Sequence, residues 1–120
     1  MEFTNNTPIY LQIADYVCDK VLSNEWTAGE RVPSVRELGA DLQVNPNTVV
    51  RTFDFLQNEN IIFYKRGIGY FVTEEAIQNI VKLNRADFFE HQLPKVFKTM
   101  AALEITFEEV RNYYDQFLKQ

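Results

Sequence analysis

The order of apolar and polar positions predicts a short helix over residues 34–42. Apolar side chains recur there at i, i+3 and i+7 and form a single stripe, Val35, Leu38 and Leu42. Ser34 and Glu37 have capping-box spacing, in which each side chain bonds to the backbone amide of the other residue. Gly39 costs a helix about 1 kcal/mol relative to alanine, so its presence predicts that another helix crosses closely there.

A second helix is expected to begin at Pro46. Asn45 is a favourable N-cap, and proline is tolerated in a first turn because its missing amide has no intrahelical partner to lose. Apolar residues at i, i+4 and i+7 form the buried stripe, Val49, Phe53 and Leu56. Only the corner at 43–45 separates the two helices, and this arrangement is typical of a helix-turn-helix.

The other face of the second helix carries side chains that suit DNA. Asn47, Thr48 and Arg51 fall near one another there, away from the apolar stripe. Asparagine can pair with adenine and arginine with guanine through two hydrogen bonds, while threonine can contact a phosphate or a base edge. We therefore predict that this face contacts DNA.

An N-terminal helix should precede the motif and pack across it. Thr7 and Pro8 provide a cap and a first-turn proline, and apolar residues then recur at helical spacing to about residue 23. No element is expected over residues 1–6. Residues 24–33 should form a connector in which Trp26 packs on the core.

Two short β-rich runs after the motif predict a hairpin. They span 61–64 and 70–72 and flank a loop with two glycines. A hairpin in this position is a wing, and Lys65, Arg66 and Gly67 at its tip could lie close to the DNA backbone or in the minor groove. The alternative is an ordinary solvated turn. Arg31, in the connector, could contact a phosphate or be solvated.

Residues 74–120 should be helical. The first helical stretch must end or kink at Pro94, because proline lacks the amide for a helical bond and disfavours helix at the preceding residue. Thr106 and Glu109 have the spacing of another capping box, so a last amphipathic helix should span about 107–119.

The tail carries more apolar surface than its few helices can enclose, because five of the ten phenylalanines lie in 74–120. We therefore expect a homodimer with the tails packed about a two-fold axis, so that two winged motifs face successive half-sites. The alternative is a monomer whose tail folds back on the winged domain. Candidate dimerisation residues are Ile77, Val81, Phe88, Phe89, Phe97, Met100, Phe107, Tyr114 and Phe117.

The net charge of the chain argues against DNA binding. The 120 residues carry a formal charge of -5, whereas a DNA-binding domain is expected to have a basic footprint. Residues 1–73 have 6 basic and 9 acidic side chains and residues 74–120 have 6 and 8, so both parts are acidic. The hypothesis therefore requires basic residues to gather on one face, namely Arg31, Arg36, Arg51, Lys65 and Arg66.

Other classes of function lack the residues they need. His91 is the only histidine and has no ligand cluster near it, so neither a metal nor another cofactor is expected. No nucleophile has a plausible base, which disfavours an enzyme. Cys18, the single cysteine, should be a buried or half-buried thiol. No apolar run approaches the roughly 20 residues of a membrane span, and the N-terminus lacks a signal pattern, so we expect a cytoplasmic protein.

Four stretches match a known family pattern in order and spacing across residues 8–73. They are Pro-Ile-Tyr-Leu-Gln-Ile at 8–13, Gly-Glu-Arg-Val-Pro-Ser-Val-Arg-Glu-Leu at 29–38, Val-Asn-Pro-Asn-Thr-Val-Val-Arg at 44–51 and Gly-Ile-Gly-Tyr-Phe-Val at 67–72. In these stretches the chain resembles the GntR family of bacterial transcription regulators. The short helical tail is most similar to the YtrA-type branch.

The resemblance implies a mainly α-helical fold with a small β-hairpin, in which a winged helix-turn-helix at 1–73 precedes a helical dimerisation segment at 74–120. It also implies a homodimer that binds an inverted-repeat operator in double-stranded DNA, usually as a repressor and often near genes for an ABC transporter. The positions that would face DNA are Arg36, Asn45, Asn47, Thr48, Arg51 and Gly67, with Lys65 and Arg66 beside it. Pro46 stands where some relatives place a contacting side chain, so the preferred DNA sequence could differ from theirs.

The sequence is also compatible with a second function. The acidic balance is compatible with a protein-interaction or scaffold module that keeps a winged fold without using it on DNA. Carboxylates covering the face that bears Arg36, Arg51 and Arg66 would favour this alternative. The sequence does not identify a small-molecule effector.

Overall fold

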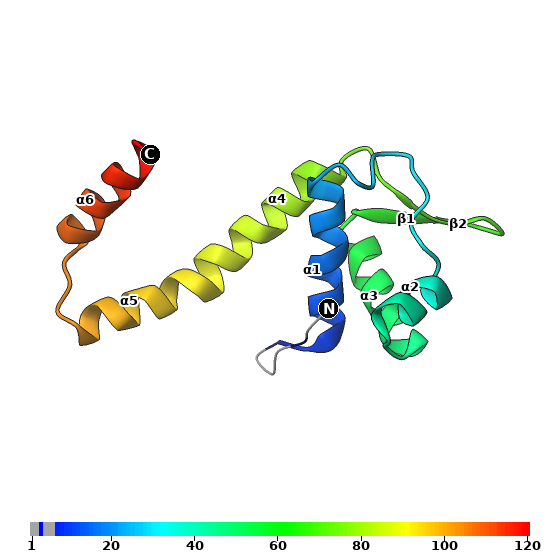
Figure 1. The fold of residues 1–120 in the computed structure, drawn as a ribbon, viewed down its shortest axis with the longest axis horizontal. Coiled ribbons are helices and arrows are strands. Elements are labelled where there is room, and N and C mark those ends of the chain that lie inside the picture. The colour runs from blue at the N-terminus through cyan, green and yellow to red at the C-terminus, as the bar shows by residue number, and fades with distance from the viewer. Residues whose placement is uncertain (1–2, 4–6) are drawn as a thin grey trace. The chain divides into compact units, whose positions relative to one another are not determined.

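Three helices and a hairpin form the N-terminal part of the protein. The computed structural model describes residue 3 and residues 7–120, so most of the segment at 1–6 lies outside the described residues. The elements in order are α1 (Ile9–Leu22), α2 (Val35–Leu42), α3 (Pro46–Asn58), β1 (Ile62–Lys65) and β2 (Gly69–Val72) (Figure 1). Then come α4 (Ala76–Asp87), the π-helical turn η1 (Phe88–Gln92), α5 (Leu93–Ala102) and α6 (Phe107–Leu118). The predicted fold class is confirmed.

The capping box at the start of α2 is present. The Ser34 hydroxyl accepts a hydrogen bond from the Glu37 amide, and the Glu37 carboxylate accepts one from the Ser34 amide, both at 3.1 Å. The bond from the Ser34 amide to the carboxylate, and then the Ser34 side chain, lower the pKa of Glu37. The local sequence therefore fixes where α2 begins, as expected.

The corner between α2 and α3 also follows the prediction. Asn45 caps α3, because its Oδ1 accepts from the Asn47 amide at 2.8 Å, and Pro46 is the first helical residue. A Cβ added at Gly39 would lie 3.2 Å from the Val44 carbonyl oxygen and 3.7 Å from the Pro46 Cα. The close neighbour of Gly39 is therefore the corner itself and the first residue of α3.

The helix α1 begins one residue later than expected. Pro8 occupies the N-cap position, and no side chain caps the helix. Thr7 instead uses its main-chain carbonyl, which accepts a hydrogen bond from the side-chain amide of Gln12 at 2.7 Å. The expectation that Thr7 would cap α1 was therefore wrong.

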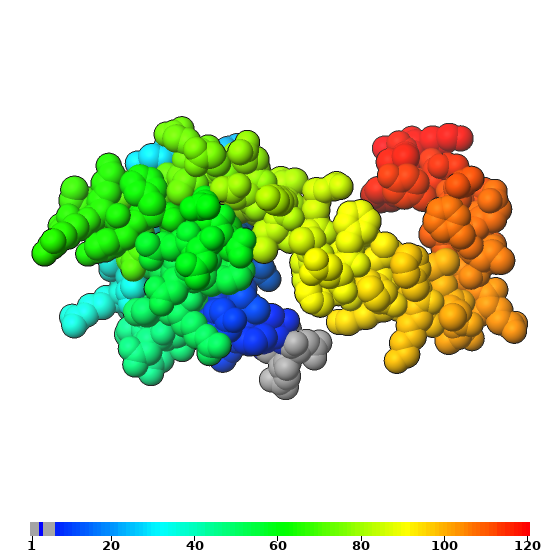
Figure 2. Space-filling model, turned by 180° about the vertical axis from the view of Figure 1, so that it is seen from behind, coloured from blue at the N-terminus to red at the C-terminus, as the bar shows by residue number. Residues whose placement is uncertain are grey.

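One hydrophobic core joins α1, α2, α3 and the hairpin. The predicted stripe of α3 is fully buried, and the ring of Phe53 meets that of Tyr70 edge-on at 4.7 Å. Trp26 packs partly buried against this core, as predicted. In Figure 2 the residues of α1 (blue) and α3 (green) belong to one packed body. Other fully buried side chains are Ile13, Val17, Val21, Val32, Leu38, Ile61, Ile62 and Val72.

The wing contains a third extended segment that the sequence did not predict. Strands β1 and β2 pair antiparallel, with Phe63 opposite Phe71. Arg31 forms an isolated bridge with Phe71 on the other side of β2, and the amide of Val32 donates to the carbonyl of Tyr70 at 2.9 Å. The connector before α2 therefore lines one edge of the hairpin, which holds the wing against the helices.

The end of α3 is fixed by Asn60. This residue has φ +57°, and the amide of Ile61 donates back to the carbonyl of Leu56 at 2.9 Å, which closes the helix end. Its carbonyl accepts two side-chain hydrogen bonds, from Thr73 at 2.7 Å and from Asn79 at 2.9 Å. These bonds tie the end of α3 to the start of α4.

The first half of α4 belongs to the winged unit. Ala76 and Ile80 are buried in its core, and Leu83 packs against it. The chain divides into two compact units at this point, Met1–Leu83 and Asn84–Gln120. The N-terminal unit therefore extends beyond the boundary expected at residue 73, because α4 contributes to its core.

The helix does not end at Pro94. Leu93, immediately before the proline, keeps helical backbone angles, and its amide bonds to the carbonyl of Phe88 across the π-helical turn η1. A π turn holds one extra residue, which lets a helix continue past a residue that lacks an amide donor. The expectation that Leu93 would leave the helical conformation was therefore wrong.

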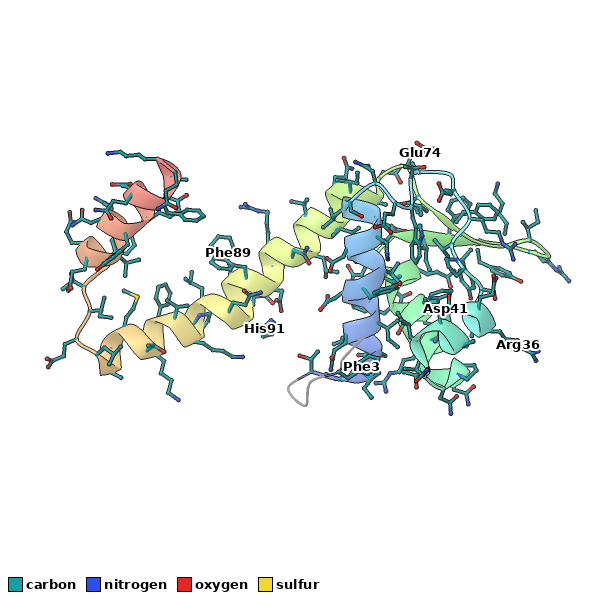
Figure 3. The ribbon with its side chains drawn as sticks, in the orientation of Figure 1. Phe3, Arg36, Asp41, Glu74, Phe89 and His91 are labelled. Atoms are coloured by element: carbon teal, nitrogen blue, oxygen red, sulfur yellow. The ribbon has the colours of Figure 1, made fainter. Side chains whose placement is uncertain are left out.

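The tail also contains two local sets of side-chain hydrogen bonds. The exposed Asp87 carboxylate accepts a hydrogen bond from the Gln92 side-chain amide at 2.8 Å and lies 3.1 Å from the Nδ1 of the exposed His91. The bond from Gln92, and then the contact with His91, lower the pKa of Asp87. In Figure 3, Phe89 and His91 project from opposite sides of this helix. Thr106 forms the expected capping box at the start of α6.

Candidate nucleic-acid interface

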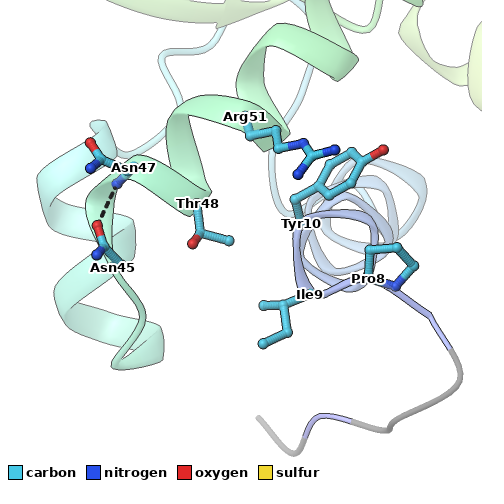
Figure 4. A pocket seen from close by; sticks show the side chains of 7 residues that line it. All are labelled: Pro8, Ile9, Tyr10, Asn45, Asn47, Thr48 and Arg51. Carbon is cyan, nitrogen blue, oxygen red and sulfur yellow. Dashed lines mark hydrogen bonds between the residues drawn. The ribbon is translucent and has the colours of Figure 1, made fainter.

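The predicted DNA-contacting side chains of α3 line one hollow together with the first turn of α1. The hollow has a volume of about 390 Å³ (Figure 4). Asn47 and Arg51 are exposed and Thr48 is half-buried, so all three are accessible. The lining residues are Pro8, Ile9, Tyr10, Asn45, Asn47, Thr48 and Arg51.

The two asparagines of the hollow differ in what they can offer to a base. The Oδ1 of Asn45 is already bonded to the Asn47 amide, as the helix cap. Pairing with adenine through two hydrogen bonds uses the oxygen and the nitrogen of the amide group together. Asn47 is therefore better suited to contact a base than Asn45.

Arg51 lies over the face of an aromatic ring. Its guanidinium carbon is 4.1 Å from the centroid of the Tyr10 ring, which is a cation–π contact (Figure 4). The sequence did not predict this contact, because Tyr10 fits the apolar stripe of α1 and nothing in its spacing relates it to Arg51. The sequence signal that could have drawn attention to Tyr10 was its place in the stretch at 8–13, which matches the family pattern. That match did not suggest a role for the tyrosine.

The wing tip consists of Lys65, Arg66 and Gly67, all exposed. The amide of Ile68 donates to the carbonyl of Lys65 at 3.0 Å and closes the turn, while Gly67 has φ +79°, a conformation that favours glycine. The Lys65 ammonium lies 4.7 Å from the centroid of the Phe71 ring on the outer face of the hairpin. The tip therefore presents positive charge on a tight turn.

Arg31 is part of the wing and not of a free connector. Its backbone pairs with Phe71, and its side chain lies against Gly69, where an added Cβ would be 3.0 Å from the Arg31 Nε. The structure thus gathers Arg31 and Lys65 on one hairpin.

Arg36 stands apart from the hollow. It is exposed near the start of α2 and projects away from the other helices (Figure 3). Among the described residues, the ion pairs are Lys20–Glu25, Asp87–His91 and Glu108–Arg111, so no carboxylate within this set pairs with the basic residues predicted to face DNA. The described residues therefore show no ion pair between a carboxylate and these basic side chains, although Glu37 lies close enough to Arg31 for the charge of Arg31 to help lower the pKa of Glu37.

Comparison with known proteins decides the family. The model of the gntR family of bacterial regulatory proteins matches residues 9–72, which is more than half of the chain and includes α1, the helix-turn-helix and the wing. The chain belongs to the GntR family. It is a DNA-binding transcription regulator and not an enzyme.

Relatives of this GntR regulator match between 65% and 93% of its length. It is 36% identical to the HTH-type transcriptional regulator YhcF of Bacillus subtilis over 91% of this chain and 88% of that protein. It is 37% identical to the transcriptional repressor YtrA of Bacillus subtilis over 65% of this chain and 60% of that protein. A GntR-family regulator from Bacteroides thetaiotaomicron has a crystal structure with a TM-score of 0.80 and 37% identity, over 93% of this chain and 97% of that one. The short YtrA-type resemblance is thereby confirmed.

The single cysteine lies in the core of the protein. Burial, and then the charges of Asp15 and Asp19, raise the pKa of the Cys18 thiol to about 12, so the predicted buried thiol is confirmed.

Within residues 3 and 7–120, no three His, Cys, Asp or Glu side chains gather as metal ligands would. None of the helices described has the length and apolar character needed to cross a bilayer.

Proposed function

We propose that this GntR regulator binds an inverted-repeat operator as a homodimer and acts as a repressor. The observation that carries the proposal is the hollow in which Asn47, Thr48 and Arg51 lie together on the accessible side of α3. The second helix of a helix-turn-helix enters the major groove with its N-terminal residues at the base edges, and these three residues occupy its first turn and a half.

The basic and polar residues divide into two sets in this proposal. Asn47, Thr48 and Arg51 contact base edges, because their side chains offer hydrogen bonds that distinguish base pairs. Lys65, Arg66 and Arg31 contact phosphates from the wing, and Arg36 and Asn45 do so from the helix-turn-helix. Gly67 lets the backbone of the wing tip come close to the DNA, because it has no side chain there. Residues 31–72 carry five basic and four acidic side chains, so this part of the chain is close to neutral although the whole chain carries a formal charge of -5.

The homodimer is supported by the exposed apolar side chains of the tail. Of the predicted dimerisation residues Met100 is half-buried, and the others expose between 42% and 69% of their surface. Large apolar side chains exposed in such number are typical of a surface that another chain covers. A two-fold axis through the tails would present two α3 faces to two half-sites about one turn of DNA apart.

Repression is supported by the relative YtrA, which is named a transcriptional repressor. Control of an ABC transporter operon is what the YtrA-type resemblance implies, and we propose it as the target on that ground. A protein with these roles acts on the chromosome, so we propose a cytoplasmic location.

A footprint on the DNA upstream of the protein's own gene tests this proposal. We expect protection of two half-sites related by inverted symmetry, with their centres one helical turn or a multiple of it apart. Addition of the protein should then lower transcription from that promoter in a purified system. Protection of a single half-site would contradict the homodimer, and increased transcription would contradict repression.

A further inference from the structure

We propose that Tyr10 is a positioning residue that holds the Arg51 guanidinium ready for a base. The proposal rests on the proposed role of Arg51 as a base-contacting residue, and it adds a function for the first turn of α1. The distance of 4.1 Å between the Arg51 guanidinium carbon and the Tyr10 ring centroid is the observation from which it starts.

The Tyr10 ring is itself held in place by α3. Phe55 meets the ring edge-on, with the centroids 6.4 Å apart and the planes at 76°. The main-chain carbonyl of Tyr10 accepts a hydrogen bond from the buried Thr52 hydroxyl at 2.7 Å. Arg51 and Phe55 are one helical turn apart, so the ring is fixed between them on one side of α3.

Stacking leaves the hydrogen-bonding edge of Arg51 free. The five donors of a guanidinium lie in its plane, so a ring that stacks on the face of the guanidinium, as we propose here, blocks none of them. Among the described residues no carboxylate forms an ion pair with Arg51 that a base would have to displace. Tyr10 therefore restrains the side chain without competing for the donors that would pair with guanine.

A restrained arginine loses less side-chain freedom when it binds. Loss of the ring should therefore weaken binding to the operator by roughly two- to fivefold, the range expected for an exposed cation–π contact. The loss should be confined to operators that carry the base pair contacted by Arg51. On DNA where that base pair is changed, the variant and the natural protein should bind alike.

Two substitutions separate the ring from the hydroxyl. Tyr10→Phe keeps the ring that faces Arg51, whereas Tyr10→Leu removes it, and neither touches the main-chain bond from Thr52. Proton NMR of the free protein provides a readout without DNA. The Arg51 side-chain protons should be shifted upfield by the ring in the natural protein and in Tyr10→Phe, and should return toward ordinary values in Tyr10→Leu. Unshifted Arg51 protons in the natural protein would overturn the stacking.

A double-mutant cycle then tests the function, with Tyr10→Leu and Arg51→Ala alone and together, at a temperature where all variants are folded. We expect Tyr10→Leu to weaken operator binding in the natural background and to have no effect once Arg51 is alanine. An equal loss in both backgrounds, or a loss in Tyr10→Phe, would overturn the inference, because Tyr10 would then act by stability or by its own DNA contact. If Arg51→Ala leaves base discrimination unchanged, the base-contacting role of Arg51 fails instead.

Discussion

Thr52 donates a hydrogen bond from its Oγ1 to the main-chain carbonyl of Tyr10 at 2.7 Å, and its side chain is fully buried. This bond connects the first turn of α1 to the middle of α3. It is a directional, buried link between the two helices, so it restricts how far α1 can slide along α3. The position of Tyr10 beside Arg51 depends on it.

Replacement of Thr52 by valine should lower the free energy of unfolding by about 1 kcal/mol. Valine keeps the shape but removes the hydroxyl, and a typical intramolecular hydrogen bond contributes about this much. Thr52→Ser is the matched control, since it keeps the hydroxyl. Urea unfolding of the three proteins measures the difference. An equal stability of Thr52→Val and the natural protein would show that the bond contributes nothing.

Arg51 and Lys65 should respond differently to replacement by alanine. Arg51→Ala should cost about 1–3 kcal/mol on the operator and relax the preference at one base pair, because a contact with a base is lost. Lys65→Ala should weaken binding to all sequences alike, because a phosphate contact is lost. The slope of log affinity against log salt concentration should become shallower by about one, since about one counterion fewer is released. Affinities on the operator and on single-base variants at several salt concentrations measure both effects. Identical behaviour of the two variants would contradict this division.

Much of the N-terminal fold was predictable because its signals are local. The capping pair Ser34 and Glu37, the cap Asn45 and the stripe of α3 each act over a few residues, and the structure has them as predicted. The pairing of Arg31 with Phe71 was not predictable, because it joins segments far apart in the sequence through main-chain bonds that no side-chain pattern marks. The turn before Pro94 was missed because a π-helical turn leaves no periodic signature.

The candidate site was predictable only in part for the same reason. Asn47, Thr48 and Arg51 share a face by helical spacing alone, and the structure brings them to one hollow. The contribution of Tyr10 required the packing of α1 on α3, which depends on tertiary contacts. The prediction for Gly39 was correct only in part. The sequence predicted a close neighbour at this glycine, but not that the neighbour would be the corner at Val44.

A charge on the apolar side of α6 should dissociate the proposed dimer. Phe117 is 69% exposed, and Phe117→Glu would place a carboxylate in the interface, which should weaken association by roughly tenfold or more. Gln116→Glu adds the same charge at a neighbouring exposed position off the apolar side, so it should leave association unchanged. Analytical ultracentrifugation across a concentration series measures both. A monomeric natural protein at all concentrations would contradict the dimer.

Cys18 should be nearly unreactive in the folded protein. Its pKa of about 12 keeps the thiol protonated well above neutral pH, whereas the same group ionises near 9.0 when exposed. The raised pKa also means that this group's contribution to stability is full below pH 9 and is lost as the pH rises from there toward 12. Labelling with a thiol reagent at pH 8 should be slow without denaturant and fast in urea. Rapid labelling of the folded protein would show that the thiol is accessible.

Fluorescence anisotropy with two duplexes, the DNA upstream of the protein's own gene and a scrambled duplex of the same length, tests the central claim most directly. Titrations across a salt series give the affinity for each. We predict tighter binding to the upstream DNA, with an affinity that falls as salt rises and a preference that persists at physiological salt. Equally weak binding to both duplexes at every salt concentration would contradict sequence-specific recognition of this DNA by the α3 face.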